Sequence, residues 1–113
     1  MTEVPLREPA FLILTALADQ PQHGYGVIEE VRRISDGQVR LQAGTLYAVL
    51  DRLREAGLIE VDREEVVQSR LRRYYKLTGL GARRLAEETV RLRRHVTVAG
   101  QRLRKLGLSG GAA

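Results

Sequence analysis

The sequence predicts a mainly α-helical protein with a small β-hairpin, namely a winged helix-turn-helix followed by one long C-terminal helix. Three observations predict this fold. Apolar residues recur at helical spacing in three short segments before residue 57, apolar and polar residues alternate in two stretches between residues 59 and 77, and helical spacing resumes after Thr78. We expect a DNA-binding domain over residues 1–77, a dimerisation helix over 78–106 and a flexible tail over 107–113.

Two short helices are expected first. One follows Pro9, because the first turn of a helix does not need the N–H that proline lacks, and it ends at Asp19-Gln20-Pro21. The next follows a turn at His23-Gly24, and Tyr25, Ile28 and Val31 share its expected apolar face. These helices would form the first part of a helix-turn-helix motif.

The third helix is expected to begin near Gln42 or Ala43 and to end at a Gly57 cap. Its core-facing residues have helical spacing: Leu46, Val49, Leu50 and Leu53. The opposite face carries small and polar residues, which suit a close approach to a DNA groove: Gly44, Thr45, Ala48, Asp51 and Arg52. Two roles are open for Tyr47, which lies between the faces: a phosphate contact, or packing on the flank of the domain.

Two strands are expected next, paired as a hairpin. In the first, Ile59, Val61 and Arg63 alternate with Glu60, Asp62 and Glu64. In the second, Tyr75 is expected in the core, whereas Arg72, Tyr74 and Lys76 point outward and form a cationic wing with Arg70. The connection around residues 66–69 contains no Gly, Asn or Pro, so we expect a longer, mobile tip rather than a two-residue turn. From Gln68 to Lys76 there are four cations and no acid, which favours phosphate contacts.

A long helix is expected from Thr78, a suitable N-cap, to about Leu106, where Gly107 ends it. Small and apolar residues recur along it at alternating spacings of four and three: Leu85, Thr89, Leu92, Val96, Ala99, Leu103 and Leu106. This alternation is typical of a coiled-coil seam, so we expect a homodimer. The seam offers little apolar area, and we expect the partner's first helix, near Phe11, to assist the pairing.

Composition argues against several classes of function. The chain has 113 residues, enough for one domain, and a net charge of +5. It has no cysteine and only two histidines, so we expect no metal site and no cofactor. No nucleophile stands out beside a base, so we do not expect an enzyme. The N-terminus lacks a signal-peptide pattern and the longest apolar run, Ala10–Ala18, is too short to span a membrane, so we expect a cytoplasmic protein.

Four motifs in combination resemble the PadR family of bacterial transcriptional regulators, over nearly the whole chain. They are His23-Gly24-Tyr25-Gly26-Val27-Ile28, Gly44-Thr45-Leu46-Tyr47 with Leu50, Arg52 and Leu53, Gly57-Leu58-Ile59, and Arg72-Arg73-Tyr74-Tyr75-Lys76-Leu77-Thr78 with Gly81 and Leu85. The single C-terminal helix is similar to that of the smaller subfamily. The resemblance implies a homodimeric repressor that binds a pseudo-palindromic DNA operator and releases it when a small-molecule effector binds. The chain departs from the family at Gln42-Ala43, where Ser-Pro is frequent, and it has no Trp to stack flat drugs.

Two sets of residues are expected to carry this function. Gln42 and Thr45 would read base edges, and Arg52 would contact phosphate. The full set expected to contact double-stranded DNA is Gln42, Thr45, Tyr47, Arg52, Arg70, Arg72, Arg73, Tyr74 and Lys76. The set expected to form the dimer is Leu85, Leu92, Val96, Ala99, Leu103 and Leu106.

Two other functions stay open at this point. A winged helix without a DNA role would act as a protein-interaction module through its last helix. Alternatively, the arginines of that helix would form a basic surface for an anionic membrane or for RNA: Arg91, Arg93, Arg94, Arg102 and Arg104. The apolar face of the helix carries no aromatic residue, which disfavours a membrane interface.

Overall fold

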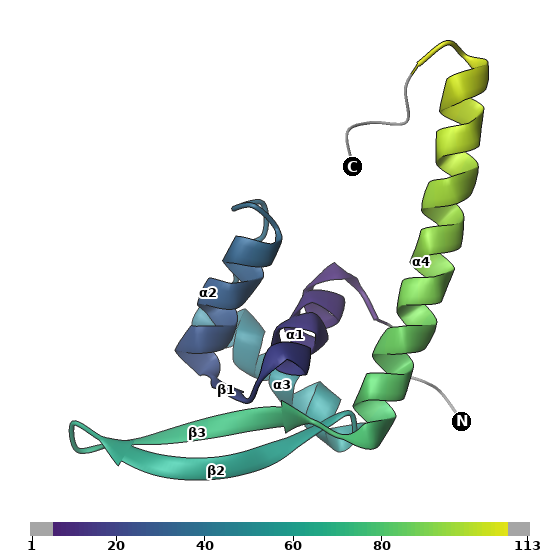
Figure 1. The fold of residues 1–113 in the computed structure, drawn as a ribbon. Coiled ribbons are helices and arrows are strands. Elements are labelled where there is room, and N and C mark those ends of the chain that lie inside the picture. Colours follow the sequence, from purple (N-terminus) through teal and green to yellow (C-terminus); the bar gives the residue numbers. More distant parts are fainter. Residues whose placement is uncertain (1–5, 109–113) are drawn as a thin grey trace.

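The computed structural model describes residues 6–108 (Figure 1). Its elements are α1 (Glu8–Asp19), β1 (Gln22–His23), α2 (Gly24–Ile34), α3 (Ala43–Glu55), β2 (Ile59–Val67), β3 (Arg70–Leu77) and α4 (Gly79–Lys105). The helices and the three-stranded antiparallel sheet confirm the predicted fold class. Residues 1–5 and 109–113 lie outside the described residues, and with them the start of the expected DNA-binding domain and most of the expected tail.

One hydrophobic core joins the first three helices to the base of the sheet. Its most deeply buried side chains come from all four parts: Ile13, Leu14, Val27, Val31, Leu46, Leu50, Leu53 and Ile59. The apolar stripe predicted for the third helix is confirmed. Burial of this apolar area is the main stabilising contribution in a domain of this size.

Tyr25 was expected on the apolar face of α2, and that expectation is wrong. The side chain is 79% exposed. Val27 and Val31 define the buried face, and Tyr25 precedes Val27 by two residues, which is a rotation of about 200° around a helix. Tyr25 therefore points away from the core.

The sheet has the strand order β1-β3-β2. The two-residue strand β1 was not predicted, because it is too short to show any alternation. It pairs with β3 and sets His23 opposite Tyr74. In β2 a bulge at Asp62 shifts the register, so that Val61 lies opposite Tyr75 but Arg63 lies opposite Tyr74. The predicted alternation is thus wrong beyond Val61, and Arg63 lies on the outer face instead of the core face.

The hairpin tip differs from the expected long connection. Val67 pairs with Arg70, which leaves only Gln68 and Ser69 between the strands. Both have left-handed backbones, with φ of 51° and 66°. This is the geometry of a type I′ turn, whose twist matches that of the flanking strands. The pairing of the strands outweighs the unfavourable backbone of two residues that are not glycine.

The start of α4 is fixed to the end of α3 by a joint around Thr78. Its Oγ1 donates to the Gly57 carbonyl at 2.6 Å and accepts from the Gly81 N–H at 3.0 Å, and its own N–H donates to the Leu58 carbonyl at 3.1 Å. Gly57 adopts a φ of 77° beyond the end of α3. A Cβ at residue 81 would lie 1.9 Å from the Leu58 oxygen, so only glycine fits there.

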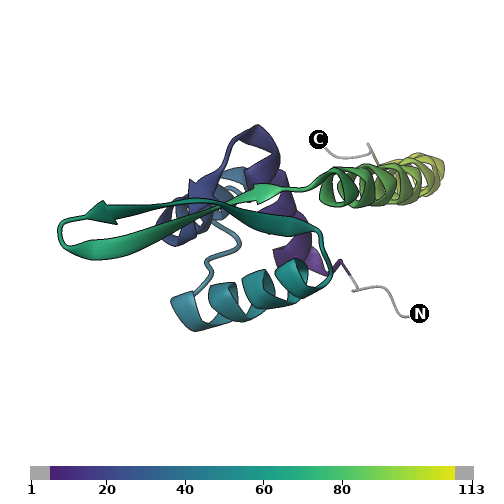
Figure 2. The ribbon, with the colours of Figure 1, turned by 90° about the horizontal axis from the view of Figure 1, so that it is seen from below.

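Beyond this joint α4 rises away from the domain, while the hairpin extends to the opposite side (Figure 1). Viewed from below, α4 is seen nearly along its axis, and α3 runs beside the hairpin (Figure 2). The distal part of α4 has few contacts with the described chain, and Val96 and Leu106 are 67% and 75% exposed. No helix within residues 6–108 is long and apolar enough to span a membrane.

Candidate nucleic-acid interface

The exposed face of α3 carries the residues expected to read DNA. Gln42, Thr45 and Arg52 are all exposed, as are the small residues Gly44 and Ala48. Gln42 occupies the N-cap position, yet its side chain makes no capping hydrogen bond. The first N–H groups of α3 consequently have no side-chain cap, and such groups favour negatively charged partners.

Tyr47 packs against the first turn of α2. A Cβ on Gly24 would lie 2.4 Å from the Tyr47 hydroxyl oxygen, so the ring occupies the space that glycine leaves. The Tyr47 side chain is still 48% exposed. Of the two roles left open by the sequence, packing on the flank is observed, and a phosphate contact stays a prediction. The contact brings the His23-Gly24 and Thr45-Leu46-Tyr47 motifs together in the fold.

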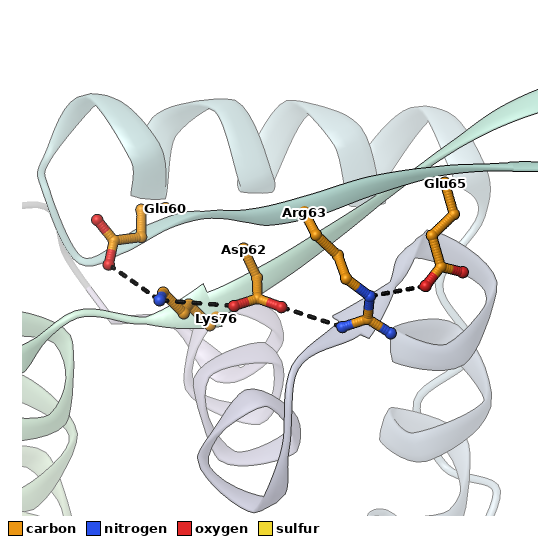
Figure 3. Close-up of polar contacts among 5 residues, drawn as sticks. All are labelled: Glu60, Asp62, Arg63, Glu65 and Lys76. Atoms are coloured by element: carbon orange, nitrogen blue, oxygen red, sulfur yellow. Dashed lines mark hydrogen bonds and ion pairs between the residues drawn. The ribbon is translucent and has the colours of Figure 1, made fainter.

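Three cations of the wing, Arg63, Arg73 and Lys76, are paired with carboxylates of β2. Figure 3 shows the pairs made by Arg63 and Lys76. Lys76 Nζ lies 3.5 Å from Asp62 and 3.9 Å from Glu60. Arg63 donates to Asp62 at 3.0 Å and to Glu65 at 2.8 Å. The hydrogen bond from Arg63 lowers the pKa of the Glu65 carboxyl, and the nearby charges of Arg63 and Arg72 add to this effect.

Arg73 forms the third of these pairs, with Glu64 at 2.9 Å on the other face of the hairpin. By contrast, no hydrogen bond or ion pair joins the guanidinium group of Arg70 or Arg72 to another residue between 6 and 108, and Arg72 acts on Glu65 only through its nearby charge. The predicted wing cations therefore divide into two kinds. Arg73 and Lys76 are neutralised within the wing, whereas Arg70 and Arg72 are available to an external anion.

Tyr74 lies on the face of β3 that points away from the core, opposite Arg63, and its ring is covered there by other side chains. Its ring is half-buried between two other side chains. The Arg63 guanidinium carbon lies 3.9 Å from the ring centroid, and the His23 ring meets it edge-on at 5.3 Å. The short strand β1 and the β2 bulge create this arrangement, and neither can be read from the alternation of residues. Tyr74 thus connects the base of the wing to α2.

His23 caps α2 at the same point. Its Nδ1 accepts a hydrogen bond from the Gly26 N–H at 3.3 Å, which requires the imidazole to be unprotonated at that nitrogen. Burial lowers the pKa of His23, the charge of Arg72 lowers it further, and Glu65 partly opposes them. Among residues 6–108, no three His, Cys, Asp or Glu side chains are placed to hold a metal ion.

The residues expected to form the dimer seam lie along α4 in two environments. Leu85 packs against the core of its own domain, and Leu92 is half-buried. Further along, the side chains are exposed: Val96, Ala99, Leu103 and Leu106. Only the distal part of the predicted seam is thus an open apolar surface in the single chain.

Sequence reasoning missed Arg63 and His23 as parts of this surface. Arg63 was assigned to the core face, because a bulge leaves no clear mark in the sequence. A useful signal was present in composition: β2 contains four carboxylates facing the basic strand β3, which predicts cross-strand ion pairs.

Comparison with known proteins agrees with this architecture. Residues 13–87 match the family described as the transcriptional regulator PadR-like family. "Transcriptional regulator Rv3488" of Mycobacterium tuberculosis is 38% identical over 76 residues, which cover 67% of each chain. The matched family and this relative are regulators of transcription, not enzymes.

Solved structures show the same fold. A PadR family transcription regulator from Clostridium difficile has a TM-score of 0.74 at 26% identity, covering 86% of this chain and 99% of that one. Bacillus subtilis PadR in complex with operator DNA has a TM-score of 0.67 at 21% identity, covering 76% of this chain and 49% of that one. The second likeness shows the winged-helix fold alone.

Proposed function

Because the chain belongs to the PadR-like family of transcriptional regulators, which bind DNA, we propose that it is a sequence-specific homodimeric repressor. In this proposal it binds a pseudo-palindromic operator in the cytoplasm and releases it when a small molecule binds. One observation carries the proposal: the exposed, small and polar face of α3 lies beside a wing on which Arg70 and Arg72 are unpaired among residues 6–108.

Each protomer would place α3 in a major groove. Gln42 and Thr45, at the N-terminal end of the exposed face, are in the position from which recognition helices contact base edges. Arg52, Arg70 and Arg72 would contact phosphates, which fix the register but carry no sequence information. Arg73 and Lys76 would contribute only after leaving their carboxylate partners.

Dimerisation would double this surface. The exposed apolar residues of α4 would pair with those of a second copy. Pairing would remove their apolar area from water, and a helix in a protein is stabilised mainly by such packing. A two-fold dimer of this kind would set the two α3 helices about 34 Å apart, one turn of DNA. An effector bound between the paired helices and the domains would change that separation.

Selection of bound sequences from a pool of random duplex DNA tests the proposal. We expect enrichment of two inverted half-sites whose centres are about 10 base pairs apart. Enrichment of single half-sites would contradict the dimer. Absence of any enrichment, together with recovery of one specific protein partner, would instead favour the interaction module.

A further inference from the structure

Four cations and three carboxylates occupy one face of the wing. Residues directly opposite one another in an antiparallel pair share a face, and Arg63 lies opposite Tyr74, Glu65 opposite Arg72 and Glu60 opposite Lys76. We call this surface the outer wing face; it comprises Glu60, Asp62, Arg63, Glu65, Arg70, Arg72, Tyr74 and Lys76. Along β3 its side chains recur every second residue, about 6.7 Å apart.

Five of these residues form a single row in which carboxylates and cations alternate (Figure 3). Asp62 lies at its centre, bound to Arg63 at 3.0 Å and to Lys76 at 3.5 Å. Glu65 binds Arg63 at one end and Glu60 binds Lys76 at the other. Every cation in the row therefore has two carboxylate partners.

The phosphates of DNA could replace these carboxylate partners. Arginine and lysine bind phosphate oxygens with the same hydrogen bonds that they give to carboxylates. The Arg63 and Lys76 side chains are 47% and 43% exposed, so a phosphate can approach them. Ion pairs at this exposure are modest in strength and are screened by salt, so a phosphate can displace the carboxylates, at a free-energy cost that weakens DNA binding.

We propose that Arg63 and Lys76 are additional phosphate-binding residues of the wing, and that Asp62, assisted by Glu65 and Glu60, restrains them by competing with DNA for the same cations. This inference rests on the proposed DNA-binding function and deepens it. In the free protein Arg70 and Arg72 are open on the outer wing face, while Arg63 and Lys76 are held by the carboxylate row. The carboxylates thereby limit how strongly the wing binds duplex of any sequence.

The test uses the full chain carrying Asp62→Asn and Glu65→Gln together, and a duplex of random sequence. The affinity of the variant and of the wild-type chain for this duplex is measured over a series of NaCl concentrations. We expect tighter binding than wild type, and a steeper fall of log K with log salt, by about 0.9 for each cation that gains a phosphate. Adding Arg63→Gln to this variant should remove most of the gain.

A matched control separates this effect from net charge. Glu8→Gln with Asp19→Asn neutralises two exposed carboxylates at the two ends of α1, away from the wing, and it should leave the salt slope unchanged. An unchanged slope or weaker binding in the Asp62 and Glu65 variant would overturn the inference while leaving the proposed function intact. Failure of the wild-type chain to bind any duplex would overturn both.

Discussion

At the scale of single residues, His23 links three parts of the molecule. Its Nδ1 caps α2 through the Gly26 N–H, its ring meets Tyr74 of the wing, and its backbone belongs to β1. The cap requires an imidazole that is unprotonated at Nδ1. Protonation would remove the acceptor at the cap and add a charge near Arg72.

This arrangement predicts a pH dependence of stability. The pKa of His23 is lowered from its ordinary value of 6.5, so the unfolded chain binds the proton more readily than the folded one. The free energy of unfolding should therefore fall as the pH drops below 6.5. The carboxyls with lowered pKa values, Glu30, Glu65 and Glu88, lose their contribution only below their ordinary value of 4.5, outside this window.

Urea unfolding at several pH values checks the prediction. His23→Asn retains an acceptor for the cap but cannot be protonated, so it should remove the loss of stability just below pH 6.5. An equal loss in His23→Asn and in wild type would assign the effect to another group.

At the scale of elements, the hairpin tip is the most strained part of the described backbone. Gln68 and Ser69 both adopt positive φ without being glycine or asparagine. A left-handed backbone costs such residues about 1–2 kcal/mol each. β2 and β3 nevertheless stay paired as far as the two turn residues, and the last pair is Val67 opposite Arg70.

Ser69→Gly should consequently stabilise the protein. We expect the free energy of unfolding to rise by about 1 kcal/mol, because glycine adopts this conformation without steric cost. Ser69→Ala is the matched control and should not stabilise, since alanine meets the same restriction. A gain in both variants would mean that the serine side chain, and not its backbone, is unfavourable.

The elements also show what could be predicted from the sequence. Helical periodicity predicted the core stripe of α3 correctly. The spacing of Leu46, Leu50 and Leu53 places them on one face of a helix, and this depends only on the local sequence. The type I′ turn and the Asp62 bulge could not be predicted, since they depend on pairing with β3 and not on local preference. The same limit applies to the site. The cations of β3 could be predicted from the sequence. The carboxylates of β2 that pair with them could not, because those pairs depend on the register between the two strands.

At the scale of the whole molecule, the distal part of α4 is incomplete in a single chain. Val96, Leu103 and Leu106 are exposed apolar residues on a helix that leaves its own domain. The opposite side of the helix carries Arg94 and Gln101, so the apolar stripe has a defined direction.

This geometry predicts the effect of charging the stripe. Val96→Asp with Leu103→Asp should convert a dimer to a monomer in sedimentation velocity, while the circular dichroism spectrum of the folded domain changes little, because both side chains are exposed in the single chain. Thr97→Asp with Gln101→Asp places the same charges on the opposite side and should leave the dimer intact. A wild-type monomer at micromolar concentration would contradict the proposed assembly.

The joint at Thr78 has a mechanical consequence for such a dimer. α4 has 27 residues and is about 40 Å long, so a tilt of only 5° at its base would displace its far end by roughly 3.5 Å. Thr78 Oγ1 and the close contact of Gly81 with Leu58 resist that tilt. In the proposed dimer α4 acts as a lever that is held at its base by these contacts. A ligand that shifts the distant pair of helices slightly would therefore rotate both α3 helices out of register with the DNA grooves.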